Sequence, residues 1–131
     1  MPTPEPIASP SAEEAVEFIR DTFRSVWSIE VLGQLRAHVD RTIAEGDLVR
    51  EMRASLLVVR QSLESLMAAG LVSIHGDDTI CYAPATPRLG ALADAALEYY
   101  RKNPDAARRV IVAALNPGAT AFAAAFKLRK D

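Results

Sequence analysis

The residues with the clearest chemistry are hydrogen-bond donors gathered in one short stretch of the chain. They are Arg50, Arg53, Ser55, Arg60, Gln61 and Ser62. A guanidinium group binds a phosphate or the edge of a guanine, and a carboxamide matches the edge of an adenine. Leu57 and Val58, in the same stretch, would suit thymine methyl groups. The set predicts a surface that binds the bases and phosphates of double-stranded DNA.

Catalytic and metal chemistry have no comparable support. The chain has two histidines, His38 and His75, and one cysteine, Cys81. Neither histidine has a partner at metal-ligand spacing, and turn chemistry explains Asp77 and Asp78 beside His75. No P-loop, dinucleotide fingerprint or nucleophile elbow is present in the sequence. We therefore expect no enzyme, no cofactor and no metal. Cys81 is expected to be a small buried residue, with a redox switch as the alternative.

Two helices joined by a tight turn would position the donors. Asp47 caps or charges the start of the first helix, and Leu48 and Met52 share its apolar face. Arg53-Ala54 forms the turn, and Ser55 caps the second helix. Apolar and small residues recur on that helix at steps of three and four, which predicts one buried stripe. They are Leu56, Val59, Leu63, Leu66 and Gly70, with Gly70 just past the helix end.

A small sheet follows. Leu71–Ile74 and Thr79–Tyr82 are rich in β-formers and are joined by the turn-rich His75–Asp78, which predicts a hairpin. The segment Arg41–Ile43 is long enough for a short first strand that pairs with this hairpin.

Residues 55 to 72 resemble the recognition helix of MarR-type and related bacterial winged-helix regulators. The matching positions are Ser55, Val59, Leu63, Leu66, Gly70, Leu71 and Val72. The resemblance covers roughly residues 28–82 and implies a winged helix-turn-helix. It also implies a dimeric DNA-binding transcriptional regulator, which would act on two half-sites about one helical turn apart.

The outward face of the second helix leaves one question open. At about 100° per residue, the positions opposite the buried stripe carry mixed side chains. They are Leu57, Val58, Gln61, Glu64 and Ser65, with Arg60 and Ser62 at the flanks. Leu57 and Val58 either form a small apolar patch, or the stripe is tilted and one of them is buried.

Charge supports a second function. Between residues 28 and 72 the acids slightly outnumber the bases, and Asp77 and Asp78 add acid to the hairpin turn. Affinity for DNA depends strongly on neutralising phosphates with Lys and Arg. The alternative is therefore a winged-helix adaptor that binds a protein through Leu57 and Val58, and does not bind DNA.

Helices are predicted on both sides of the motif. Met1–Pro10 is rich in proline and reads as a disordered arm, and Ser11 with Glu14 forms a capping box that starts a helix ending near Phe23. Ser28 is expected to cap the next helix, whose apolar positions are Val31, Leu32, Leu35 and Val39. Trp27 is expected to lie in the core.

Two or three helices follow the motif. Thr86-Pro87 and Asn103-Pro104 each combine a cap with proline at the first helical position, and Ala119–Lys127 is a candidate last helix. We predict one mainly α domain over residues 11–131, with the motif at 28–82 and C-terminal helices at 86–131. The flanking helices are expected to form a homodimer. An effector pocket would lie between the motif and the C-terminal helices.

The 131 residues carry a net charge of −2, so the whole molecule has no strong attraction for nucleic acid. The N-terminal part is acidic and the C-terminal part is basic, which indicates either solvated helix faces or attraction between the two ends. Residues 1–10 lack the features of a signal peptide, and no apolar stretch approaches the roughly 20 residues that span a bilayer. The basic tail is expected to dock on its own domain rather than on a membrane. We expect a cytoplasmic protein.

Overall fold

The computed structural model describes residues 9–115. Its helices are α1 (Ala12–Thr22), α2 (Val26–Ala37), α3 (Glu45–Met52), α4 (Leu56–Ala68), α5 (Pro87–Lys102) and α6 (Pro104–Leu115). Its strands are β1 (Ile43–Ala44), β2 (Val72–Ile74) and β3 (Thr79–Tyr82). The prediction of a mainly α chain with a small β-hairpin is confirmed at this level. Most of the predicted arm, the predicted last helix and the basic tail lie outside the described residues.

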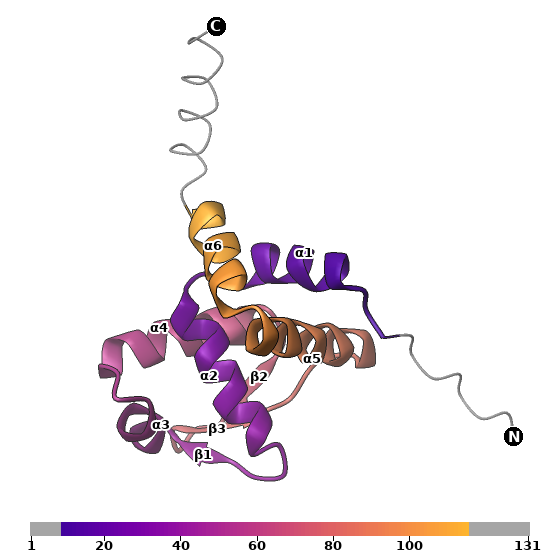
Figure 1. Cartoon of the computed structure of the whole chain (residues 1–131). Coiled ribbons are helices and arrows are strands. Elements are labelled where there is room, and N and C mark those ends of the chain that lie inside the picture. The colour runs from indigo at the N-terminus through magenta and orange to yellow at the C-terminus, as the bar shows by residue number, and fades with distance from the viewer. Residues whose placement is uncertain (1–8, 116–131) are drawn as a thin grey trace, which may run out of the picture.

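The helices form two groups (Figure 1). In the first, α1 packs along α5 and against α6, and α5 also contacts α6. In the second, α2 packs on α4, and α3 packs on both. The sheet lies beside the second group, where β2 contacts α4 and β3 contacts α2. One hydrophobic core joins both groups, because buried residues of all six helices in the described range belong to a single cluster.

The sheet has the order β1-β3-β2 and is antiparallel throughout. Ile43 of β1 lies opposite Ile80 of β3, and Val72 of β2 lies opposite Tyr82. Ile80 and Tyr82 are both buried, as alternation along a half-buried strand requires. The predicted hairpin and its pairing with a short first strand are confirmed. That strand includes Ala44 and omits the predicted residues Arg41 and Thr42.

The start of α1 follows its prediction. The hydroxyl of Ser11 accepts a hydrogen bond from the Glu14 N–H, and the Glu14 carboxylate accepts one from the Ser11 N–H. These two bonds satisfy donors that the first turn of a helix leaves unpaired.

The prediction that Ser28 caps α2 is wrong. Ser25 is the cap, and Ser28 is the third helical residue, buried and bonded back to the Ser25 backbone. The prediction that Trp27 lies in the core is also wrong, since Trp27 is 41% exposed. With the cap at Ser25, Trp27 falls in the first turn of α2, to one side of the buried stripe. Val39 is exposed as well, because α2 ends at Ala37.

The C-terminal helices begin at the predicted residues. Thr86 caps α5, with Pro87 as the first helical residue, and α6 begins at Pro104. Leu115, the last residue of α6, is exposed. Leu56, predicted in the buried stripe of α4, is also exposed, because it is the first residue of the helix and the stripe begins one turn later at Val59.

Candidate nucleic-acid interface

The connection between α3 and α4 fixes the position of every predicted DNA-binding residue. Arg53 is the C-cap of α3 and has a left-handed backbone (φ 52°), so the helix cannot continue past it. Ser55 then caps α4, and its hydroxyl accepts a hydrogen bond from the Val58 N–H at 3.1 Å. The predicted turn at Arg53-Ala54 and the predicted cap at Ser55 are both confirmed.

The far end of α4 is fixed as firmly. The Gly70 N–H donates to the Met67 carbonyl at 3.0 Å, and the Leu71 N–H donates to the Leu66 carbonyl at 3.0 Å. This pattern closes the helix with Gly70 in the left-handed region (φ 77°), which glycine adopts at least cost. The prediction for Gly70 is therefore confirmed, and α4 has a defined start and a defined end.

The first helix of the pair begins earlier than predicted. Glu45 is the first residue of α3, and the preceding Ala44 occupies the cap position without a side-chain hydrogen bond. Asp47 lies within the first turn, where its charge favours the positive end of the helix dipole. Of the two predicted roles for Asp47, charging the helix start is the one that the structure supports.

The exposed face of α4 carries most of the predicted base-reading residues. Leu57 is 65% exposed, and Arg60, Gln61 and Glu64 are also exposed. Val58 is half-buried, so the apolar patch predicted from Leu57 and Val58 is centred on Leu57. The tilted-stripe alternative therefore holds in part.

Ser62 is a correction. It was predicted to assist base recognition, yet it is only 2% exposed. Its hydroxyl donates to the Val58 carbonyl at 2.9 Å, within the helix. On the helix circumference Ser62 lies next to Leu66, at the margin of the buried stripe, so it faces the core and cannot reach a ligand on the outer face.

The arginines differ in their partners. Arg50 forms an ion pair with Asp47 on the same helix, and both side chains are well exposed. The Arg60 Nε donates to a carboxylate oxygen of Glu45 at 3.1 Å, across the two helices. Arg53 is exposed and forms no ion pair with any residue from 9 to 115. The candidate surface thus has one unpaired cation and two that already neutralise acids.

The hairpin turn is acidic. Asp77 and Asp78 are both exposed, and Asp78 has a left-handed backbone (φ 61°). The Thr79 hydroxyl donates to the Asp77 carboxylate at 2.6 Å, and this hydrogen bond lowers the pKa of Asp77. Turn chemistry therefore accounts for both residues, as predicted. A DNA duplex approaching this turn would meet two negative charges.

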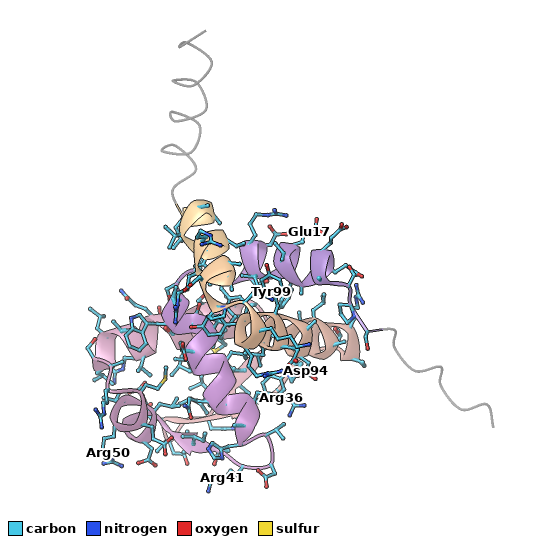
Figure 2. The ribbon with its side chains drawn as sticks, viewed as in Figure 1. Glu17, Arg36, Arg41, Arg50, Asp94 and Tyr99 are labelled. Atoms are coloured by element: carbon cyan, nitrogen blue, oxygen red, sulfur yellow. The ribbon has the colours of Figure 1, made fainter. Side chains whose placement is uncertain are left out.

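Sequence reasoning missed one further basic residue beside α3, Arg41. The Arg41 guanidinium lies 3.1 Å from the Nδ1 atom of His38, and both residues line a cavity of about 300 Å³. Arg50 and the acids Asp47 and Glu51 also line this cavity. Figure 2 shows Arg41 and Arg50 at the end of the molecule that holds the sheet, away from Glu17 and Tyr99. The loop position of Arg41 gave no periodic signal by which it could have been found.

Cys81 is half-buried, and its sulfur lies 3.6 Å from the Nε2 atom of His75. The prediction of a small buried cysteine is therefore met only in part. Within residues 9–115, His, Cys, Asp and Glu side chains form no group of three or more that could hold a metal ion. In the same range, no helix is long and apolar enough to cross a membrane.

Larger cavities lie along α5. One of about 570 Å³ separates the start of α1 from α5 and includes Asp94 and Tyr99 in its wall. Another of about 560 Å³ lies between α2 and α5, where an effector pocket was predicted, and includes Glu30 and Tyr100. The Tyr100 hydroxyl donates to Glu30, and burial is the main cause of its raised pKa.

Comparison with known proteins adds no assignment, because no family model, curated protein or solved structure matches the chain.

Proposed function

We propose that the chain is a winged helix-turn-helix protein that binds DNA as a homodimer and regulates transcription. The observation that carries the proposal is the order α2-β1-α3-α4-β2-β3, in which α3 and α4 are joined by the turn from Arg53 to Ser55. In helix-turn-helix proteins the second helix of such a pair lies in the major groove. The likeness of residues 55–72 to MarR-type regulators supports the same function.

The exposed residues of α4 have matching roles. Arg60 and Gln61 would read base edges, and Leu57 would contact a thymine methyl group. Val58 is half-buried and would contribute only at the margin of this contact. Ser62 has no part, since it is buried.

Phosphates would be held at the start of α4. Arg53 is available for this role without breaking an ion pair in the described part of the chain. Arg50 would exchange Asp47 for a phosphate, and that exchange is inexpensive because exposed ion pairs contribute little. Ser55 ends the turn, and free N–H groups at the helix start add favourable contacts.

The homodimer would use the flanking helices α1, α5 and α6. These lie on the side of the molecule away from α3 (Figure 1), so a dimer formed there would leave both copies of α4 open to DNA. Two-fold symmetry would then place two α4 helices on two half-sites.

The test is fluorescence anisotropy of the purified protein with labelled mixed duplex fragments, from low to moderate salt. Binding through phosphates should weaken linearly when the logarithm of affinity is plotted against the logarithm of salt. The Arg53→Ala variant should reduce the slope by about one contact. Failure of the wild-type protein to bind at low salt would contradict the proposal.

A second candidate function, a protein-binding adaptor, is favoured by one observation. Leu56, Leu57 and Met67 are all exposed on α4, although large apolar side chains gain by burial. If this face binds a protein, Leu57→Asp should abolish capture of the partner, whereas Arg53→Ala should leave it intact. Capture that survives Leu57→Asp in a folded variant would exclude the adaptor function.

A further inference from the structure

The ion pair between Arg60 and Glu45 differs from the Arg50–Asp47 pair, which is the other one described on this surface. It joins the first residue of α3 to the second turn of α4, whereas the Arg50–Asp47 pair lies within α3. The Glu45 side chain is only 17% exposed, compared with 55% for Arg60. Glu45 is therefore the fixed partner, and Arg60 is the partner that reaches into solvent.

The backbone of Glu45 is held as well. Its N–H donates to the Asp78 carbonyl at 3.0 Å, which ties the start of α3 to the hairpin turn. The Glu45 carboxylate is thus positioned by two elements, α3 and the turn, before it meets α4. A side chain supported in this way restricts the rotamers of the group that it binds.

Only one edge of the Arg60 guanidinium is used by this pair. The Nε atom donates to Glu45, and the terminal nitrogens form no hydrogen bond with any residue from 9 to 115. Those terminal groups carry parallel N–H donors in a fixed plane. Two parallel donors match the O6 and N7 acceptors that only guanine presents in the major groove.

We propose that Glu45 is a positioning residue that holds Arg60 for bidentate recognition of a guanine. This inference rests on the proposed DNA-binding function and adds to it the identity of one base. Arg60 contacts the base, and Glu45 acts through Arg60. A phosphate contact by Arg60 would need no fixed guanidinium plane. Guanine recognition and phosphate binding by Arg60 therefore predict different effects of substituting Glu45.

The test begins with a duplex that the wild-type protein selects from a randomised pool. Each position of that duplex is then replaced in turn, and binding is measured by anisotropy. We expect one G·C pair whose replacement lowers affinity about 5- to 150-fold. In the Arg60→Ala variant, that replacement should have no effect. Arg60→Lys should also lose the preference while keeping the salt dependence, because lysine retains the charge without the planar pair of donors.

Glu45→Ala should reduce the guanine preference at the same position and at no other. Glu45→Gln keeps an oxygen that accepts from Nε, so it should retain more of the preference than Glu45→Ala. Added to Arg60→Ala, the Glu45→Ala change should alter the preference no further. Thermal melting of each variant establishes that it is folded, and the Glu45→Gln and Arg60→Lys variants carry the test if Glu45→Ala does not fold.

Glu51→Ala is the matched control, since Glu51 is an exposed acid of α3 that forms no ion pair with a described residue. It should strengthen binding to all sequences slightly and leave the base preference unchanged. Wild-type binding with no guanine position that depends on Arg60 would overturn this inference alone. A uniform loss of affinity in Arg60→Ala would do the same, by assigning Arg60 to a phosphate. No wild-type binding at low salt would overturn the proposed function together with this inference.

Discussion

Arg53 is expected to lower the stability of the fold through its backbone and to favour DNA binding through its side chain. Its backbone is left-handed (φ 52°), which costs free energy in any residue with a Cβ atom, and its side chain is the unpaired cation of the α3–α4 turn in the described chain. Arg53→Gly should therefore raise the free energy of unfolding, by on the order of 0.5–1 kcal/mol, and weaken DNA binding. Urea denaturation and anisotropy measure the two effects.

Arg53→Ala separates them. Alanine removes the cation but keeps the Cβ atom, so this variant should bind DNA as weakly as Arg53→Gly without the gain in stability. Equal stability of the two variants would show that the strain at Arg53 is negligible.

For single residues, the sequence predicted correctly which side chains of α4 are exposed in most cases, but it did not predict the ion pairs that they form. Periodicity predicted that Leu57, Gln61 and Glu64 face outward, because a helix repeats its orientation regularly. It placed Ser62 at the edge of that face, where a small rotation of the helix decides between solvent and core. It gave no sign of the pair between Arg60 and Glu45, since their contact depends on how two helices pack.

Gly70 determines where α4 ends, and its backbone faces Leu89 of α5. Its φ of 77° suits glycine, and a Cβ atom there would lie 3.4 Å from both the Ala85 Cβ and a Leu89 methyl. Gly70→Ala should lower the free energy of unfolding by about 1–2 kcal/mol, as measured by urea denaturation. Gly46→Ala, within α3, is the control, because a Cβ atom at Gly46 would meet no atom within 4 Å. That change should be neutral or stabilise by up to about 1 kcal/mol.

The capping box of α1 predicts a dependence on pH. The Ser11 N–H, followed by Arg88, lowers the pKa of Glu14 below its ordinary value of 4.5. The ionised Glu14 therefore stabilises the folded state above pH 4.5, and this stabilisation is lost as the pH falls through the lowered pKa. Urea midpoints measured from neutral pH to pH 3 should fall less steeply in Glu14→Gln than in the wild type. Glu13→Gln, at the next position, should behave like the wild type.

Element boundaries were predicted best where a cap and a turn residue coincide. Ser11, Ser55, Gly70 and Thr86 all mark helix ends in the structure. The start of α2 was misplaced because Ser25 and Ser28 are equally good caps, and local sequence does not choose between them. The start of α3 at Glu45 could not be predicted from a capping residue, because Ala44 at the cap position has no side chain that can accept a hydrogen bond.

At the scale of the whole molecule, the proposed dimer makes a prediction. Light scattering behind a sizing column should give a mass near twice 14.2 kDa at micromolar concentration. A Tyr99→Arg change places a bulky charge between α1 and α5, where Tyr99 lines two cavities, and should shift the mass toward the monomer. A monomer at all concentrations would contradict the homodimer. Leu57→Arg, on the opposite side of the molecule, is the control and should leave the mass unchanged.

The arrangement of the two helix groups could not be derived from the sequence. Periodicity identifies an apolar face, but the partner of that face is set by packing that joins residues far apart in the chain. Within residues 9–115, the basic residues of the C-terminal part that form ion pairs do so inside their own helices: Arg101 and Lys102 with Glu98, and Arg108 with Asp105. The C-terminal basic residues beyond 115 lie outside the described range, so attraction between the ends stays a prediction.

Arg36 connects three elements through one side chain. From α2 it donates to Asp94 of α5 at 2.8 Å (Figure 2). Its guanidinium also lies 5.4 Å from the centre of the Tyr82 ring of β3. A fragment cut after Ala85 would retain Arg36 and Tyr82 and lose Asp94, together with the buried alanines of α5. The minimal piece that folds by itself therefore extends well past the hairpin, and limited proteolysis should release no stable core that ends before α5.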